Sequence, residues 1–264
     1  MSEAEERAAR LGEAAAAWAG TRRVEVNGWR IRTREAGSGP PLVLVHGLGV
    51  SADYWYRNGP PLAAAGFRVL APDLPGFGRT EGPDGGLPVT AQAAALLAWS
   101  RTMELGPALY VGHSLSCQCL LELAASAPER IRGLVLASPT GAPVPYRRLR
   151  QALAFLADIP REDWRLVPVV GEAYLRAGPL RVLRTWRRGA EHDPLPLLPR
   201  VRAPARVVVG ARDPVVSRDF AETLADGLPG DRRVRWIEGA AHAVHFGRPD
   251  AFNRAVAEFA AELP

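Results

Sequence analysis

The sequence predicts an α/β protein in which helices cover both faces of a mostly parallel β-sheet. Short apolar runs without alternation recur along the chain, which is typical of strands buried on both faces. Segments of helical period lie between these runs, and Gly and Pro stand at the joints, which favours a three-layer arrangement. The composition agrees with this fold, because 264 residues of which 47% are apolar can build one large core.

The first elements are a helix and a hairpin. Residues 1 to about 20 are polar and alanine-rich, which predicts a helix or a tail. Arg22–Val26 and Trp29–Glu35 then alternate apolar and polar residues around Asn27-Gly28. Because Asn-Gly fills the two positive-φ positions of a tight turn, this stretch is predicted to form two paired strands.

Six further strands complete a predicted sheet of eight. Their segments are Leu42–Val45, Arg68–Ala71, Ala108–Val111, Leu134–Ala137, Val207–Val209 and Arg233–Ile237. The helices predicted between and after them are Pro61–Ala65, Ala91–Leu105, Leu115–Ala127, Asp219–Leu228 and Pro249–Leu263. Because strand and helix alternate, these six strands are expected to run mostly parallel.

The segment between the sixth and seventh strands breaks this alternation. It contains three helical stretches and then four prolines, and the stretches are Tyr146–Ile159, Asp163–Ala177 and Leu180–Ala190. A stretch of ~60 residues buries too little surface to stand alone as a domain. We therefore expect residues 141–206 to form a helical cap on a core made of residues 1–140 and 207–264.

Membrane, secreted and metal-binding classes of protein are disfavoured. No apolar run approaches the ~18 residues of a membrane-spanning helix. The acidic start, Met1 to Arg7, is unlike a secretory leader. Cys117 and Cys119 are the only cysteines, and their spacing suits neither a disulfide framework nor a zinc site, so buried free thiols are expected. These observations predict a cytoplasmic protein with no membrane partner and no metal.

A candidate nucleophile follows the fifth strand. Gly112-His113-Ser114-Leu115-Ser116 keeps the first glycine and the serine of the nucleophile elbow G-x-S-x-G, with Ser116 in place of the last glycine. A serine on this strand-to-helix turn has a strained backbone, and the helix N-terminus directs partial positive charge toward it. Serine is among the smallest replacements for glycine, so we expect the turn to form. The alternative is that Ser114 only caps the helix.

Two residues after later strands are placed to activate Ser114. His242 follows the eighth strand, and an imidazole can take the serine proton and return it to a leaving group. His245 is the rival base, and it could instead line the pocket or pack against the closing helix. Asp213 follows the seventh strand and could orient the imidazole, although it could instead cap the next helix, a position that Ser217 fits better. The order Ser114, Asp213, His242 is that of one of three convergent triads.

A site for a developing oxyanion is expected after the third strand. In His46-Gly47-Leu48-Gly49 the glycines let the backbone bend, so that the Leu48 amide can face Ser114 together with the Leu115 amide. The candidate walls of a substrate pocket are Tyr54, Trp55, Tyr174 and Trp186. Ordinary packing in the core is an equally good interpretation of these four aromatic residues.

With these motifs, the chain resembles the α/β-hydrolase superfamily from Arg22 through Leu263. Pro72–Thr80 is similar to the family's loop after the fourth strand, and Ala125–Arg130 to the turn that leaves the nucleophile helix. Gly112–Gln118 resembles small bacterial cytoplasmic members with a short cap. The sequence departs from the family pattern at Ser116, and at Gly247, where many relatives carry Glu.

The resemblance implies acyl-transfer hydrolysis by Ser114, Asp213 and His242 without a cofactor. A serine nucleophile disfavours the haloalkane dehalogenases and epoxide hydrolases of the family, which use a carboxylate. The predicted function is therefore a serine hydrolase that cleaves an ester, lactone or thioester through an acyl-enzyme. Carbon–carbon bond hydrolysis of vinylogous diketones and acyl transfer use the same triad and stay open. A slow or non-catalytic ligand receptor is a further alternative.

The charge of the chain is concentrated in the expected cap. All 33 basic residues are Arg, and they leave a net charge of +5. Residues 141–206 hold 13 Arg and 6 acidic residues, whereas the rest of the chain holds slightly more acids than Arg. This excess over the predicted active-site entrance favours an anionic small-molecule substrate over a nucleic acid. Solvated helix surface is the alternative.

Overall fold

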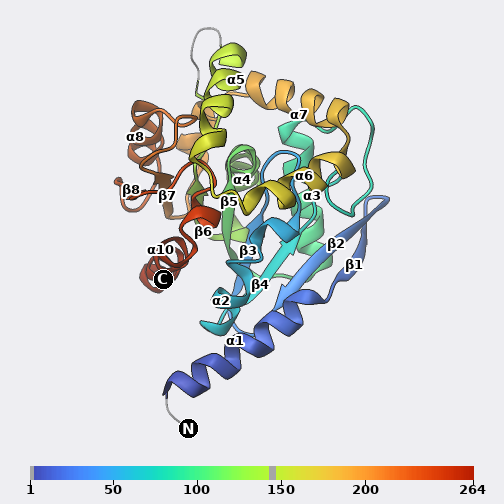
Figure 1. The fold of residues 1–264 in the computed structure, drawn as a ribbon, viewed down its shortest axis with the longest axis vertical. Coiled ribbons are helices and arrows are strands. Elements are labelled where there is room, and N and C mark those ends of the chain that lie inside the picture. Colours follow the sequence, from blue (N-terminus) through green and yellow to red (C-terminus); the bar gives the residue numbers. More distant parts are fainter. Residues whose placement is uncertain (1–2, 143–146) are drawn as a thin grey trace.

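A computed structural model describes residues 3–142 and 147–264 of the chain (Figure 1). Its eight strands form one sheet in the order β1-β2-β4-β3-β5-β6-β7-β8. The strands are β1 Arg22–Val26, β2 Trp29–Ala36, β3 Pro41–Val45, β4 Arg68–Pro72, β5 Ala108–His113, β6 Ile131–Ala137, β7 Ala205–Gly210 and β8 Val234–Ile237. Only β2 runs against its neighbours, so the predicted mostly parallel sheet is confirmed.

The hairpin forms where the sequence predicts it. Val26 pairs with Trp29 across the turn, and Asn27 and Gly28 have φ angles of 49° and 82°. These are the positive values that a tight hairpin turn requires at both central positions. The turn therefore fixes the register of β1 on β2 at the open edge of the sheet.

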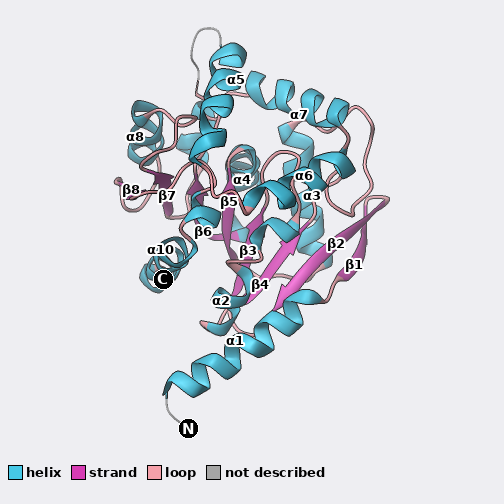
Figure 2. Cartoon of the chain, in the orientation of Figure 1, coloured by secondary structure: helices cyan, strands magenta, loops and turns pink. Residues whose placement is uncertain are grey.

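Helices cover both faces of the sheet (Figure 2). The helices outside the segment between β6 and β7 are α1 Glu3–Ala19, α2 Gly59–Ala64, α3 Val89–Thr102, α4 Leu115–Ser126, α8 Arg218–Gly227, α9 Val244–Gly247 and α10 Pro249–Glu262. One apolar cluster joins α3, α4 and α8 to one face, and a second joins α1, α2 and α10 to the other. Val43 belongs to the first cluster and Leu44 to the second, because successive side chains of a strand alternate between faces.

Between β6 and β7, the described residues form three α-helices and two short 3₁₀ helices. The α-helices are α5 Arg147–Asp158, α6 Leu166–Ala177 and α7 Pro179–Glu191, and Figure 1 shows them together at the end of the molecule away from both chain termini. Tyr146, the expected first residue of α5, lies outside the described residues. The second helix begins at Leu166 rather than at Asp163, because the Asp163 carboxylate accepts the Arg165 N–H in a turn before it.

Arg181 of α7 fastens this helical segment to the loop after β4. Its guanidinium donates to the carbonyl oxygens of Gly76, Pro83 and Gly82 at 3.1 to 3.3 Å. Several hydrogen bonds from one side chain give a fixed contact between remote stretches of chain. Within the described ranges, no helix is long and apolar enough to cross a membrane.

A buried ion pair joins the antiparallel strand β2 to the loops at the carboxyl ends of β3 and β4. Arg32 on β2 and Asp73 after β4 both have fully buried side chains, and their charged groups are 3.0 Å apart. Asp73 also accepts the N–H groups of Ala52 and Arg79 at 2.7 and 2.8 Å. Asp73 therefore holds the loop that continues from β3, which passes close to the candidate site.

Replacing Asp73 tests this role. Asp73→Ala leaves the buried Arg32 guanidinium with Asp53 as its remaining acidic partner and removes the acceptor of two backbone N–H groups, which together costs ~2 to 4 kcal/mol of unfolding free energy. Urea denaturation measures the loss. In the matched control Glu25→Ala, the pair with Arg30 is 67% exposed on both sides, so the loss stays below ~1 kcal/mol. Equal losses in the two variants would contradict the role assigned to Asp73.

Candidate active site

Ser114 stands at the turn between β5 and α4 in a backbone conformation that non-glycine residues rarely adopt. Its φ and ψ angles are 57° and −118°. The close packing of the turn explains why glycine precedes it by two residues, since a Cβ at Gly112 would lie 2.8 Å from Leu120 Cδ1. Such strain costs ~1 to 3 kcal/mol and persists only where the surrounding structure imposes it. The turn thus has the geometry expected of a nucleophile elbow.

Ser116 contributes hydrogen bonds that glycine could not make. Its Oγ accepts the His113 N–H at 2.8 Å and lies 2.8 Å from the Val45 carbonyl oxygen, to which it donates. Val45 is the last residue of β3, so the hydroxyl links the turn after β5 to the neighbouring strand. The departure from the G-x-S-x-G pattern is therefore accommodated, and Ser116 stabilises the turn.

His242 and Asp213 form a continuous hydrogen-bonded chain with Ser114. His242 Nε2 lies 2.9 Å from Ser114 Oγ, and His242 Nδ1 lies 2.9 Å from Asp213 Oδ2. The other oxygen of Asp213 accepts the N–H groups of Val215 and Val216 at 2.7 and 3.2 Å. When Nδ1 donates to Asp213, Nε2 is free to accept the serine proton. The structure thus brings together the three residues that the sequence analysis selected.

The charges of this group favour an ionised Asp213. Burial raises the pKa of Asp213, but the charge and the hydrogen bond of His242 outweigh burial and leave this pKa below its ordinary value. Burial lowers the pKa of His242, but the charge and hydrogen bond of Asp213, together with the neighbouring acids Asp158 and Glu162, outweigh burial and leave the pKa raised. The carboxylate therefore stabilises an imidazolium at His242.

The loop after β3 passes beside Ser114, as the oxyanion prediction requires. A Cβ at Gly47 would lie 3.5 Å from Ser114 Cβ and 3.2 Å from the His113 carbonyl oxygen, so glycine permits this approach. Leu48 is the next residue, and Leu115 is the first residue of α4. The Tyr174 ring packs directly on Gly49, where φ is 76°. The loop is thereby held between the turn of Ser114 and helix α6.

The structure places most of the candidate pocket residues in the packing around the site. Trp55 and His245 are fully buried, and Tyr54 is 4% exposed. The ring centroid of His245 lies 4.2 Å from that of Trp55 and 4.4 Å from that of Tyr54. The half-buried Trp186 donates its Nε1–H to Gln151 at 3.0 Å. His242, and not His245, is the histidine in contact with Ser114.

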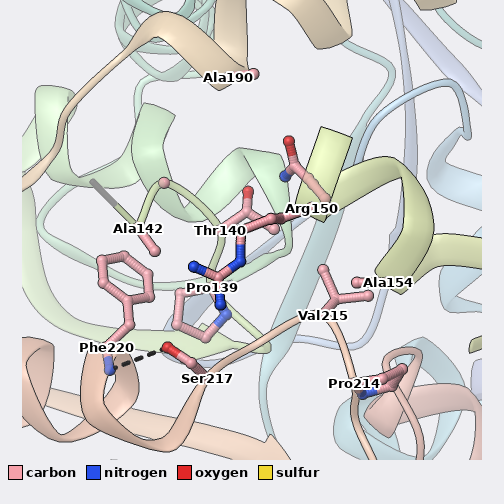
Figure 3. A pocket seen from close by; sticks show the side chains of 12 residues that line it. Pro139, Thr140, Ala142, Arg150, Ala154, Ala190, Pro214, Val215, Ser217 and Phe220 are labelled. Atoms are coloured by element: carbon pink, nitrogen blue, oxygen red, sulfur yellow. Dashed lines mark hydrogen bonds between the residues drawn. The ribbon is translucent and has the colours of Figure 1, made fainter. Parts of the chain in front are cut away.

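A cavity of about 170 Å³ lies beside the Asp213 loop and under α5 (Figure 3). Its walls are mostly apolar and include Pro139, Ala142, Ala154, Pro214, Val215 and Phe220. Among the described residues that line it, Arg150 is the one that carries a charge, and Figure 3 shows its side chain directed among them. The sequence signalled this residue only through the excess of Arg in residues 141–206.

Two acidic residues near His242 were not predicted as site residues. Asp158 Oδ1 lies 3.2 Å from the His242 backbone nitrogen, and Glu162 Oε1 lies 2.5 Å from that of Ala243. Asp158 ends α5 and Glu162 follows it by four residues, and their contacts with the His242 loop span 84 and 81 positions of sequence. Contacts between such distant stretches have no local signature, so no pattern in the sequence could have identified these residues.

The buried histidines make the fold sensitive to acid. Burial lowers the pKa of His245 well below its ordinary value and that of His113 to about 3. Below pH ~6.5 the unfolded chain therefore binds protons that the native chain excludes, and each histidine lowers the unfolding free energy by ~1.4 kcal/mol per pH unit of acidification. We predict that His245→Phe makes the plot of unfolding free energy against pH shallower between about pH 6 and 4.

Urea denaturation across this pH range measures that slope. Phe252→Leu is the matched control, because Phe252 contacts the His245 ring and carries no titrating group. It is expected to lower stability at every pH and to leave the slope as it is. A slope in His245→Phe equal to that of the unaltered protein would show that His245 takes up a proton in the native state.

Comparisons with known proteins agree with this architecture. A protein-family sequence model, described as the alpha/beta hydrolase family, matches residues 42–255 of this chain. A 2-hydroxy-6-oxo-6-phenylhexa-2,4-dienoate hydrolase of Comamonas testosteroni is 28% identical over 89% of this chain and 92% of its own. A pimeloyl-[acyl-carrier protein] methyl ester esterase of Edwardsiella ictaluri is 31% identical, and the match covers 83% of this chain and 92% of the esterase.

Solved structures resemble the fold over nearly its whole length. A thermophilic esterase from Thermogutta terrifontis has a TM-score of 0.80 at 22% identity and covers 92% of this chain and 98% of its own. An enol-lactonase from Burkholderia xenovorans has a TM-score of 0.74 at 24% identity, with 91% and 100% covered. Together with the family match over most of the chain, these similarities identify the protein as a member of the alpha/beta hydrolase family.

Proposed function

We propose that the protein is a serine hydrolase that cleaves carboxylic ester-type bonds through an acyl-enzyme on Ser114. The hydrogen-bonded chain from Ser114 through His242 to Asp213 is the observation that supports this proposal most directly. A serine hydroxyl is a weak nucleophile, and a base within hydrogen-bond reach is what activates it. The strained turn presents Ser114 Oγ to that base.

In the first half of the proposed reaction, His242 Nε2 takes the proton of Ser114 Oγ while this oxygen attacks the substrate carbonyl. The carbonyl oxygen becomes an anion, and the amides of Leu48 and Leu115 are the donors we assign to it. The imidazolium, stabilised by Asp213, then gives its proton to the leaving alcohol as the carbon–oxygen bond breaks. The acyl group is now an ester of Ser114.

In the second half, water replaces the alcohol. His242 takes a proton from water, the resulting hydroxide attacks the acyl carbon, and the proton returns to Ser114 Oγ as the acid leaves. Every proton in the cycle is accounted for by His242, the substrate and water. The proposed chemistry therefore needs no cofactor.

We assign residues 141–206 the role of a cap over this site. Ser114 and His242 are each only 5% exposed, and the rings of Phe155 on α5 and His242 are 5.4 Å apart between centroids. In this proposal the helical segment shifts to admit substrate to Ser114. The helices then close over the bound substrate and exclude water other than the attacking molecule.

We propose a substrate with an anionic group remote from the scissile bond. The apolar cavity beside the Asp213 loop has the Arg150 guanidinium as its charged group, which suits a short apolar chain that ends in a carboxylate. The net positive charge of residues 141–206 would attract such a substrate. The name of the Comamonas testosteroni relative, a dienoate hydrolase, also denotes a substrate that carries a carboxylate.

Carbon–carbon bond hydrolysis is the second candidate, because dienoate hydrolases from Comamonas testosteroni and Burkholderia cepacia match 89% of the chain. An assay of 2-hydroxy-6-oxo-6-phenylhexa-2,4-dienoate beside a panel of carboxylic esters and lactones separates the two activities. Faster turnover of the dienoate than of every ester would favour the second candidate.

The Ser114→Ala variant tests the proposed nucleophile. With p-nitrophenyl acetate, the unaltered protein is expected to release a burst of about one p-nitrophenol per molecule before steady turnover, since acylation precedes hydrolysis of the acyl-enzyme. Ser114→Ala should show no burst and lose about 10³-fold or more in kcat. Ser126→Ala, at the exposed end of α4, is the control and should leave both unchanged. Full activity in Ser114→Ala would refute the mechanism.

Arg150→Gln tests the anionic substrate. Loss of a charged hydrogen bond should raise KM about tenfold for an ester with a terminal carboxylate and leave KM for its neutral methyl ester unchanged. In the unaltered protein, added salt should lower kcat/KM more for the anionic ester than for the neutral one. Arg187→Gln, an exposed arginine on α7, controls for a loss of overall charge. Equal effects on the two esters would remove the proposal.

A further inference from the structure

Two carboxyl groups from the helical segment hold the loop that carries His242. Asp158, the last residue of α5, accepts the backbone N–H of His242 at 3.2 Å. Glu162, just after the short 3₁₀ helix Ile159–Arg161, accepts the next N–H, that of Ala243, at 2.5 Å. Two consecutive backbone N–H groups of the loop after β8 are thus bound by two acids from the segment between β6 and β7.

The two acids lie close enough for the charge of one to act on the other. Asp158 is 6% exposed and Glu162 is half-buried. Two neighbouring carboxylates are costly to ionise together away from water. Burial and the charge of Asp158 raise the pKa of Glu162 to about 8, so Glu162 holds its proton near neutral pH. Burial also raises the pKa of Asp158, which is left as the acid that carries the charge of the pair.

His242 is the group in this environment that can carry the compensating positive charge. The pair is faced by His242 itself, by Asp213 from the loop after β7 and by the Tyr54 hydroxyl from the 3₁₀ turn Ala52–Trp55. The adjacent Asp163 is already paired with Arg57, at 3.0 Å. The charge of the pair therefore acts on the imidazole from the side of the helical segment, while Asp213 acts on it from the sheet.

We propose that Asp158 and Glu162 are positioning residues that act through His242, holding its loop by two amide hydrogen bonds and stabilising its imidazolium form when the helical segment is closed. The inference rests on the proposed function for its role in catalysis. Because both acids belong to the helical segment, they make this contact only while that segment covers the site. Closure and the basicity of the general base are then coupled by the same two side chains.

The sign of the effect on pH dependence follows from the charge. A negative group near His242 favours the protonated imidazole, and the reaction needs the neutral imidazole as base. Removing the charge of the pair should therefore let His242 become neutral at lower pH. The acidic limb of kcat/KM, which reports the essential base of the free enzyme, should move in the same direction.

The decisive variant is the double substitution Asp158→Asn with Glu162→Gln. The amide side chains keep the shape and an acceptor oxygen for each backbone N–H, so the change removes charge and spares the hydrogen bonds. NMR titration of the His242 ring nitrogens in labelled protein should show a midpoint about one pH unit lower than in the unaltered protein. Glu162→Gln alone should leave the midpoint close to that of the unaltered protein, because Glu162 already holds a proton near neutral pH and Asp158 keeps the charge.

Glu172→Gln is the matched control, since Glu172 is an exposed acid of α6 paired with Arg176. Its His242 midpoint should equal that of the unaltered protein. An unchanged midpoint in the double variant, or in Asp158→Ser with Glu162→Gln should the first double variant fail to fold, would overturn the inference, as would an equal shift in the control. A loss of stability alone, with the midpoint unmoved, would leave the acids a merely structural role and also overturn it.

The titration needs no substrate, so it separates this inference from the proposed function. If Ser114→Ala retains full activity while the His242 midpoint shifts in the double variant, the proposed mechanism fails and the coupling of the acids to His242 stands. In the double variant, the expected outcome is a joint shift, relative to the unaltered protein, of the titration midpoint and of the acidic limb of kcat/KM for p-nitrophenyl acetate.

Discussion

The strained turn at Ser114 is the constraint on which the site depends. A φ of 57° at a serine is unfavourable on its own and is imposed here by the pairing of β5 and by the start of α4 directly after it. Gly112 permits the close contact with α4, and Ser116 links the turn to the end of β3. Without this turn the serine hydroxyl could not stand at the edge of the sheet within reach of a base. The packing and hydrogen bonds around the turn thus hold Ser114 in this strained conformation.

The parallel sheet explains how residues remote in sequence meet at this turn. Ser114, Asp213 and His242 follow β5, β7 and β8, and 128 residues separate the serine from the histidine. Parallel strands end at the same edge, so loops that follow them converge there. The helical segment after β6 then covers this edge, and Phe155, Asp158 and Glu162 contact the His242 loop from above the sheet. Core and helical segment together define the environment of the imidazole.

The sequence predicted those parts of the molecule that have local causes. Asn27-Gly28 specified the hairpin, buried apolar runs specified the parallel strands, and the motif at Gly112–Ser116 specified the strained turn. The group formed by Ser114, Asp213 and His242 could be predicted because each residue follows a strand. The roles of Asp158 and Glu162 could not, since they arise from packing of α5 on a loop more than 80 residues away. Burial of His245 likewise depends on aromatic neighbours brought together by the fold.

The central claim is that Ser114 is a nucleophile activated by His242. Diethyl p-nitrophenyl phosphate forms a stable ester with an activated serine and expels p-nitrophenol, so mass spectrometry of the digested protein locates the reactive hydroxyl directly. We expect a single diethylphosphoryl group on Ser114 and a loss of this labelling in His242→Ala, where the base is missing. Labelling of a different residue, or labelling of Ser114 at the same rate in His242→Ala, would contradict this claim.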